Sequence, residues 1–293
     1  MKMLLNRVFC TILAAGLVFG AAVVPNASSK RYLEDKKIKE AAVDYIEANS
    51  LEKAPEYISI NGDIYALTME DNFDGDDIDP NHWARCPEIP RADVGGYWDD
   101  DMTAARDGNL WLSVYVDEEG VPRSGGIRSK GIFEQAYGYF EARMMFQNTT
   151  GYWGAFWMMC GDVNRVGDAG VDGAEIDIIE SGDYPDSANH AVHYDGYDPK
   201  YHQSWDSDVK LKDRDVRELF EGWHTYAFEW TEDEYRFYVD GELTWTNNAG
   251  GICVNPGYLK LTTECGTWAG KLVPEELPDS VRCDWVRVYQ KVK

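Results

Sequence analysis

From about residue 57 to the end of the chain, short runs rich in β-branched and aromatic residues alternate with clusters of glycine, aspartate and asparagine. A succession of such runs, each bounded by turn-forming residues, predicts an all-β domain. Asp240 and Gly241 join two of the runs and are a strong two-residue hairpin signal. No internal repeat or linker interrupts the pattern, so we predict a single β domain over residues 57–293. The clearest predicted strands are residues 110–116, 136–146, 152–160, 175–180, 191–194, 225–230, 235–239, 258–263 and 281–290.

The N-terminal segment has the layout of a secretory signal. Residues 1–7 carry two positive charges, and residues 8–24 form an apolar run with small residues toward its end. We therefore expect residues 1–29 to be a signal peptide and the protein to be secreted; an uncleaved membrane anchor is the alternative. Residues 30–56 are expected to form a charged extension or linker, in which residues 31–49 make a moderately amphipathic helix.

The acidic character of the chain excludes several classes of partner. The formal net charge is −24, with 52 acidic and 28 basic side chains. Such a chain repels nucleic acid and anionic membranes, and it should bind sulfated polymers poorly unless its charge is very unevenly distributed. Its 11 tryptophans and 18 tyrosines suit the apolar faces of sugar rings, although core packing explains most such residues in any domain. The sequence implies no protein partner, and we expect a monomer.

The most informative stretch contains three acids close together, Glu175, Asp177 and Glu180. In a regular strand, Glu175 and Asp177 share one face, while Glu180 turns to the other. One extra residue, a β-bulge around residues 178–179, restores the parity and returns Glu180 to the face of the other two acids. Bulges often redirect a side chain beside an active site, so we predict a bulged strand with all three carboxylates on one side.

Three acids on one strand face repel one another, which costs stability unless the arrangement has a use. With the bulge, Glu175 and Glu180 lie about 13 Å apart at their Cα atoms, and leaning side chains can narrow this gap across a curved sheet. A retaining glycosidase needs carboxyl groups about 5–5.5 Å apart, and an inverting one about 6.5–9.5 Å. Asp177 lies between them, where it can hydrogen-bond the nucleophile and help to separate the two pKa values. An acidic exposed face or a calcium site would also explain the pattern.

The acid strand, Gly-Ala-Glu-Ile-Asp-Ile-Ile-Glu, resembles the E-x-D-x-x-E signature of glycoside hydrolase family 16, in the bulged form typical of laminarinase-like endo-β-1,3(4)-glucanases. The resemblance covers residues 67–291. It implies a concanavalin-A-like β-jelly-roll sandwich, with two curved antiparallel sheets and a concave substrate cleft. It also implies that Glu175 is the nucleophile, Asp177 its helper and Glu180 the general acid/base. The other matching blocks lie at residues 69–75, 107–112, 124–130, 137–143, 153–158, 190–194, 223–230, 236–241 and 284–289.

The resemblance also suggests which side chains bind the sugar. Trp153 and Trp157 precede the acid strand and are expected to line the subsites around the scissile bond, although core packing would equally explain Trp157. His193 matches a family histidine near the acid/base, with a purely structural histidine as the alternative. Trp98 lies in residues 94–102, where the chain departs from the block that laminarinases often carry in this part of the negative subsites.

Two further side chains are candidates for sugar binding: Trp268 as a platform at the cleft rim, and Arg143, on a strand typical of the cleft, as a hydrogen-bond donor. Many family members hold a calcium ion on the convex side, away from the cleft. Asp284 matches the acid that binds it, with the carbonyl groups of Glu70 and Gly108 as candidate partners. A structural role for Asp284 without metal is the alternative, because one carboxylate does not make a calcium site. The chemistry itself requires no cofactor.

Together, these features predict a secreted retaining glycoside hydrolase that cleaves internal bonds of β-1,3 or mixed β-1,3-1,4 glucans by double displacement. A galactan hydrolase or a transglycosylase on the same fold is an alternative, and so is a non-catalytic carbohydrate-binding jelly roll. The three acids argue against the binding module, which has no need of a bulged carboxylate pair. The strong negative charge argues against a sulfated substrate.

Overall fold

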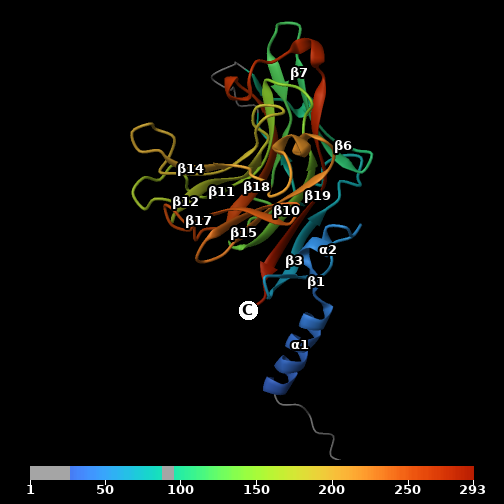
Figure 1. Cartoon of the computed structure of the whole chain (residues 1–293), viewed down its shortest axis with the longest axis vertical. Helices are drawn as coiled ribbons and strands as arrows, with labels where there is room; N and C mark the ends of the chain where they lie inside the picture. Colours follow the sequence, from blue (N-terminus) through green and yellow to red (C-terminus); the bar gives the residue numbers. More distant parts are fainter. Residues whose placement is uncertain (1–26, 88–95) are drawn as a thin grey trace, which may run out of the picture. The chain divides into compact units, whose positions relative to one another are not determined.

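The computed structural model describes residues 27–87 and 96–293 (Figure 1). The signal peptide predicted for residues 1–29 therefore lies almost entirely outside the described residues. The chain divides into two compact units, with the boundary after Glu40. Helix α1 (Ala27–Ala41) accounts for the described part of the first unit, and most of its described side chains are exposed. Within the described part of the chain, no helix is long and apolar enough to cross a membrane.

In the second unit, the described strands form two sheets around a common core, which we call sheet A and sheet B. Neighbouring described strands run antiparallel, apart from the short parallel pairs β1–β2 and β5–β8. The predicted all-β jelly-roll fold is therefore confirmed. The twelve described strands of sheet A are β1 (Val43–Asp44), β2 (Tyr57–Ile60), β3 (Asp63–Asp71), β5 (Tyr97–Trp98), β6 (Thr103–Arg106), β7 (Asn109–Val116), β8 (Pro122–Ser124), β10 (Gly138–Met145), β15 (His224–Trp230), β16 (Tyr235–Val239), β17 (Glu242–Asn247) and β19 (Asp279–Lys291).

Sheet B contains the acid strand near its centre, with β13 on one side of it and β11 on the other. β11, β12 and β18 lie side by side in Figure 1. The seven described strands of sheet B are β4 (Ala84–Arg85), β9 (Gly126–Arg128), β11 (Tyr152–Gly161), β12 (Gly173–Glu180), β13 (Asn189–Tyr194), β14 (Gln203–Asp208) and β18 (Gly257–Cys265). The remaining short elements are α2 (Tyr45–Ala48) and the 3-10 helices η1 (Asp100–Met102), η2 (Val216–Phe220), η3 (Thr267–Ala269) and η4 (Pro274–Glu276).

The hydrophobic core fills the space between the two sheets. Along β10, Phe140, Ala142 and Met144 are core residues, because side chains of a strand alternate between its two faces. Sheet B contributes apolar residues such as Ile176 and Leu261 from its own inner face. Burying these side chains stabilises the fold by about 25 cal/mol per Å² of apolar surface removed from water. The outer face of each sheet is therefore available for polar side chains.

The sequence pattern predicts a sandwich that begins at residue 57, but residues 43–60 already belong to it. β1 pairs with β2, and β2 pairs with β3, so this segment extends one edge of sheet A. Ala48 and Ile58 pack against Tyr139 in a second apolar cluster, on the face of sheet A that turns away from the core. The segment therefore covers part of the outer face of sheet A.

The charged segment before β2 does not form one continuous helix. α1 ends at Ala41, and Asp44 caps a second helix of one turn, where its carboxylate accepts a hydrogen bond from Ile46 N at 3.0 Å. A side chain that bonds a free backbone N–H in this way favours the start of a helix. The helix predicted over residues 31–49 is thus divided in two, with β1 between the parts.

The hairpin between β16 and β17 forms at the predicted position. Asp240 and Gly241 both adopt left-handed backbone conformations, with φ angles of 48° and 77°. Two successive residues with positive φ are the backbone of a tight two-residue turn, and glycine adopts this conformation without strain. The carboxylate of Asp240 also accepts hydrogen bonds from Thr225 N at 2.9 Å and Arg214 Nη1 at 2.7 Å. These bonds tie the turn to its surroundings.

Candidate active site

The bulge predicted in the acid strand is present. Opposite β11, the register shifts by one residue after Asp177 and leaves Ile178 without a partner. The register with β13 shifts in the same place. Ile178 and the residue after it are both fully buried in the core. The three acids, Glu175, Asp177 and Glu180, line a pocket on the opposite face, as the parity argument predicts.

This pocket, which we call the cleft, has a volume of about 560 Å³ and lies over β11, β12 and β18. Cross-strand partners share a face of the sheet, so rows of side chains run across the cleft from strand to strand. One such row contains Asp177 of β12, Trp157 of β11, Lys260 of β18 and Arg128 of β9. Asp177, an aromatic ring and two cations are therefore neighbours in one row.

Glu175 accepts a short hydrogen bond at Oε2 from the hydroxyl group of Tyr197. His193 is its cross-strand partner on β13. Burial and the neighbouring charge of Asp177 raise the pKa of Glu175 to about 7. The Tyr197 hydrogen bond and the positive charges of His193 and Lys260 oppose this rise. Several groups thus favour the ionised form of Glu175, which is the form that a nucleophile needs.

Glu180 lies in a different electrostatic environment. Among the described residues, its carboxylate accepts one long hydrogen bond, from Asn189 Nδ2 at 3.5 Å. Burial raises the pKa of Glu180 well above its usual range, and the nearby charge of Asp177 adds to the rise. A carboxyl group that keeps its proton near neutral pH is suited to protonate a leaving group. The two environments therefore suit Glu180 to acid catalysis and Glu175 to nucleophilic attack.

Asp177 is buried between the two glutamates and lies beside an imidazole pair. Its Oδ2 is 3.4 Å from Nε2 of His193. On the other side of that ring, Nδ1 of His193 is 3.1 Å from Nε2 of His202, which stacks on it. Burial lowers the pKa of His193, but the hydrogen bond and charge of Asp177 outweigh burial and raise it. His193 therefore lies beside Asp177 and is paired with Glu175, whereas the resemblance suggests a position near Glu180.

Three of the predicted sugar-binding tryptophans line the cleft. Trp98 and Trp157 flank the ammonium group of Lys260, whose Nζ lies 4.5 and 3.4 Å from their ring centroids. Trp157 belongs to an apolar cluster in the cleft and not to the core between the sheets. Trp153 lines the cleft as well and contacts Trp268 edge-on, with ring centroids 5.1 Å apart. Trp268 is 48% exposed, as expected for a platform at the rim.

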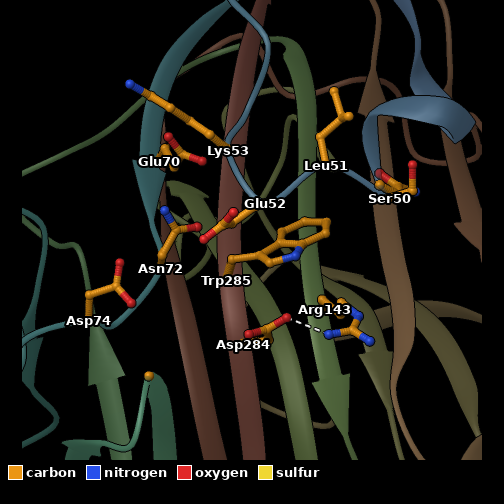
Figure 2. Close-up of a pocket in the computed structure, with 12 residues that line it drawn as sticks. Ser50, Leu51, Glu52, Lys53, Glu70, Asn72, Asp74, Arg143, Asp284 and Trp285 are labelled. Atoms are coloured by element: carbon orange, nitrogen blue, oxygen red, sulfur yellow. Dashed lines mark hydrogen bonds and ion pairs between the residues drawn. The ribbon is translucent and has the colours of Figure 1, made fainter.

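Arg143 does not lie in the cleft, so the prediction that it donates hydrogen bonds to sugar there is wrong. It lies on β10 of sheet A, and its Nη1 donates to Oδ2 of Asp284 at 2.5 Å (Figure 2). Its guanidinium group also lies over the ring of Trp223, 5.2 Å from the centroid. The error has a physical reason: alternation within one strand separates its two faces but does not reveal which sheet the strand joins.

The predicted calcium ligands, Asp284, Glu70 and Gly108, line one pocket beside Arg143. Figure 2 shows Asp284 and Glu70 in this pocket. Asn72 lines the same pocket, and its buried Oδ1 has no hydrogen-bond partner among the described residues. Carboxylate, amide and carbonyl oxygens are the donors that calcium prefers. The residues therefore fit a calcium ion by donor type, with the Arg143 guanidinium group as a competing cation at Asp284.

Among the cleft residues that sequence reasoning missed, Lys260 and Tyr197 lie closest to the predicted acids and tryptophans. Lys260 is 7% exposed, and burial lowers its pKa. A lysine between two leucines of a predicted strand, Leu259 and Leu261, was a usable signal, because a buried ammonium group needs a compensating interaction. Tyr197 reaches Glu175 from the loop between β13 and β14. No local pattern marks this tyrosine, since its partner lies on another strand.

The fold and the acid strand agree with a comparison against known families. A family model described as "Beta-porphyranase A-D, GH16 domain" matches residues 66–291, well over half of the chain. The chain belongs to glycoside hydrolase family 16. The match begins at β3 and ends with the last strand of sheet A, so that it includes every described strand of sheet B.

This family 16 chain is similar to proteins with different specificities. It is 24% identical over 269 residues to the glucan endo-1,3-beta-glucosidase A1 of Niallia circulans, a match that covers 77% of this chain and 38% of that protein. It is 28% identical over 246 residues to the keratan-sulfate endo-1,4-beta-galactosidase of Sphingobacterium multivorum, covering 77% of this chain and 55% of that protein. The chain therefore spans only part of the length of these relatives.

Among solved structures, the catalytic domain of an endo-1,3-beta-glucanase (laminarinase) from Thermotoga petrophila RKU-1 resembles this family 16 chain. The TM-score is 0.65 at 26% sequence identity, and the match covers 79% of this chain and 100% of that one. The match thus extends over the whole of that catalytic domain.

Proposed function

We propose that this family 16 member is a secreted, retaining endo-glycosidase that hydrolyses β-1,3 or mixed β-1,3-1,4 glucans. One observation carries the proposal: the bulge in β12 turns Glu180 to the same face as Glu175, inside a cleft with tryptophan walls. Two of the similar proteins, from Niallia circulans and Thermotoga petrophila, bear the names of endo-1,3-β-glucanases and support the choice of polymer.

In the first step, Glu175 attacks the anomeric carbon while Glu180 gives its proton to the glycosidic oxygen. A glycosyl ester forms on Glu175, and the reducing-end fragment leaves. The charge of Glu175 is one cause of the raised pKa of Glu180, so ester formation lowers that pKa at the moment when Glu180 must become a base. The geometry of the pair thus supports the change of role.

In the second step, ionised Glu180 takes a proton from a water molecule, whose oxygen attacks the anomeric carbon. The ester bond breaks, its electron pair returns to the Glu175 carboxylate, and the sugar leaves with the configuration it had at the start. Burial and the charge of Asp177, which lies between the two glutamates, raise the pKa of both. No step requires a cofactor.

The test combines a polysaccharide panel with substitution of each carboxylate. Wild-type protein should release reducing ends from barley β-glucan or laminarin, and Glu175→Gln and Glu180→Gln should release almost none. With azide and an activated aryl β-glycoside, Glu175→Ala should give the α-glycosyl azide, and Glu180→Ala the β-glycosyl azide, because azide then replaces the nucleophile or the water. Full activity of Glu175→Gln on every glucan would end the proposal.

A second candidate substrate is a β-galactan with anionic substituents, and a group of cations in the cleft favours it. Lys260 and Arg128 are cross-strand partners, and the ammonium group of Lys130 lies 5.3 Å from the ring centroid of Tyr258. The charge of Lys260 interacts with those of Glu175 and Glu264, and four described carboxylates line the cleft beside these three cations. The described lining of the cleft therefore has a smaller relative excess of acids than the chain as a whole, which weakens the argument from net charge against a sulfated substrate. The similar protein from Sphingobacterium multivorum bears the name of a keratan-sulfate galactosidase.

The same panel separates the two candidates when agarose, carrageenan and keratan sulfate are added. Lys260→Met removes the charge but keeps an unbranched side chain in the cleft. On an anionic polymer this change should lower kcat/KM roughly tenfold or more, because a hydrogen bond to a charged group is lost. On a neutral glucan the loss should be clearly smaller. Cleavage of laminarin alone would exclude the galactan.

We propose secretion from the sequence of residues 1–29. N-terminal sequencing of protein recovered from the culture medium should give a start within or just after this segment. Full-length protein found in the membrane fraction would instead favour an uncleaved anchor.

We also propose a structural calcium ion in the pocket of Asp284. Thermal unfolding should then occur at lower temperature after dialysis against EGTA, and added calcium should restore the midpoint. Asp284→Asn should abolish the response to calcium. A midpoint that does not depend on EGTA would mean that the Arg143 guanidinium group is the only cation that Asp284 needs.

A further inference from the structure

The loop of residues 195–202, between β13 and β14, is anchored where it begins. Asp195 and Gly196 both have left-handed backbone conformations, with φ angles of 60° and 77°, which turn the chain sharply. Gly196 N donates to the carbonyl oxygen of Val163 at 2.7 Å, and Oδ1 of Asp195 accepts from Gly167 N at 2.9 Å. These two bonds tie the turn to a neighbouring loop and fix the direction in which the next residue points.

The next residue is Tyr197, whose hydroxyl group donates to Oε2 of Glu175. The residue is 48% exposed, yet it lines the cleft beside the acid strand. Burial and the charge of Glu175 raise the pKa of Tyr197 well above its usual range, so the phenol keeps its proton and remains a donor. A loop residue thus makes a direct contact with the nucleophile.

The far end of the loop is fixed as well. His202 N donates to the carbonyl oxygen of Asp198 at 2.9 Å. The His202 ring stacks on His193 with centroids 5.2 Å apart and an interplanar angle of 10°. Tyr197 therefore lies between two anchored ends. Such anchoring makes it a donor that is oriented before substrate binds.

We propose that Tyr197 is a positioning residue for the nucleophile, an inference that rests on the proposed function. By holding Oε2 of Glu175, it fixes the carboxylate and leaves Oε1 to form the bond to the anomeric carbon. In the glycosyl ester, the same hydroxyl donates to the carbonyl oxygen. When water attacks, the electron pair of the ester bond returns to a carboxylate that Tyr197 again stabilises. A hydrogen bond is stronger to the charged form than to the ester, so it favours departure of the carboxylate in the second step.

Other titratable groups around Glu175 also affect its pKa. Burial and the charge of Asp177 raise the pKa of Glu175 to about 7, and the Tyr197 hydrogen bond is the first of the causes that lower it. Removing the hydroxyl must therefore raise this pKa further. The titratable groups that face Glu175 are Asp177 and Glu180 from its own strand, His193 from β13, and Lys260 and Tyr258 from β18.

The test compares Tyr197→Phe with Tyr201→Phe, which removes a hydroxyl from the same loop. The Tyr201 hydroxyl accepts a hydrogen bond from Lys200 Nζ at 2.7 Å and is a matched control. Both changes keep the ring on an exposed loop, and equal thermal midpoints would verify folding. Carbon-13 NMR of labelled glutamate carboxyl groups, assigned with Glu175→Gln, follows the titration of Glu175 without any substrate. Activity is then measured against pH on the best polymer of the panel.

In Tyr197→Phe, the pKa of Glu175 should rise, and the acidic limb of the kcat/KM profile should move to higher pH by the same amount. At the pH optimum, kcat should fall roughly tenfold or more, with little change in KM, because the lost bond is to a charged group. Tyr201→Phe should behave as wild type in both measurements.

Two results would contradict different parts of this reasoning. An unchanged Glu175 titration in Tyr197→Phe overturns the inference, whatever the activity. A titration that shifts as expected, in a protein that cleaves no polymer, overturns the proposed function and leaves the contact between the loop and Glu175 intact. A shifted titration with unchanged kcat overturns the positioning role.

Discussion

Glu141 on the outer face of sheet A and Glu175 in the cleft of sheet B are perturbed in the same direction. Burial raises the pKa of Glu141 to about 8 and that of Glu175 to about 7. Glu141 is 2% exposed and accepts a hydrogen bond from the Tyr139 hydroxyl at 3.2 Å, beneath the cluster that residues 43–60 complete. Glu175 opens onto a pocket of about 560 Å³. A raised pKa therefore does not separate a working carboxylate from a structural one.

Buried carboxylates in sheet A and in the cleft differ more clearly in their hydrogen-bond partners. Glu229, near Glu141 in sheet A, accepts bonds from Tyr65 at 2.6 Å, Tyr238 at 2.8 Å and Arg236 at 2.9 Å. Its oxygens are satisfied by the protein. Glu180 in the cleft has one long bond among the described residues. A buried acid with a full set of donors stabilises the fold, whereas one with few donors beside an open cleft is free to exchange a proton with a ligand.

The largest expected effect is on activity, and it tests whether activity depends on the cleft and not on the outer face of sheet A. Glu175→Gln should lower kcat/KM roughly 10³-fold or more, because an amide cannot replace the nucleophile. Glu141→Gln is the matched change on the outer face, and its kcat/KM should remain close to that of wild type. Both are measured on the best polymer of the panel. A comparable loss of kcat/KM in Glu141→Gln would contradict the distinction between the cleft and the outer face of sheet A.

The next effect is on stability and concerns the outer face. Glu229→Ala should lower the free energy of unfolding by about 3–5 kcal/mol, since the Arg236 charge and two tyrosine hydroxyls lose their buried acceptor. Glu234→Ala removes a partly exposed partner of the same Arg236 and should cost about 1 kcal/mol or less. Urea denaturation at neutral pH measures both. Equal losses would mean that burial of Glu229 contributes nothing.

A further effect, of similar total size, appears in the dependence of stability on pH. The folded-state pKa of Glu141 is raised from 4.5 to about 8, so the folded protein keeps a proton that the unfolded chain releases. The stability that this proton supplies is complete below pH 4.5 and is lost as the pH rises toward 8, by at most about 1.4 kcal/mol per pH unit. Glu141→Gln should therefore flatten the decline in unfolding free energy between these limits. The same slope as wild type would contradict the assignment.

The contribution of Glu175 to stability also decreases as the pH rises, but over a narrower pH range. Its folded-state pKa is raised from 4.5 to about 7, so its contribution is complete below pH 4.5 and is lost by about pH 7. Glu175→Gln should flatten the decline only within that range. The two variants can therefore be told apart by the pH at which their effect on stability ends. This pH is higher for Glu141 in sheet A than for Glu175 in the cleft.

The smallest expected effect concerns the rim of the cleft. Trp268→Ala should raise KM roughly threefold to tenfold with little change in kcat, because an exposed platform binds substrate and transition state alike. Trp205→Ala, which removes an exposed tryptophan on β14 of sheet B, should leave KM unchanged. Steady-state kinetics on the polymer measure both. Equal changes would remove Trp268 from the sugar-binding surface.

The sequence by itself determined the β-rich character of the chain and the bulge in the acid strand. Both depend on local geometry, because a two-residue period fixes which side chains share a face. In a regular strand, the spacing from Glu175 to Glu180 places the two acids on opposite faces, so a shared face requires one extra residue. That residue is Ile178. The hairpin at Asp240 and Gly241 was equally local, since two positive φ angles favour those residue types.

The tertiary structure alone decided which strands became neighbours. Arg143 was assigned to the wrong sheet, and Lys260 and Tyr197 entered the cleft from segments far from the acid strand in sequence. Residues 43–60 joined the outer face of sheet A, although their charge pattern indicated an extension. The physical reason is common to all of them. The sequence of a strand determines which of its side chains share a face. Which strands pair with one another depends on segments far apart in the sequence and on how the whole core is buried.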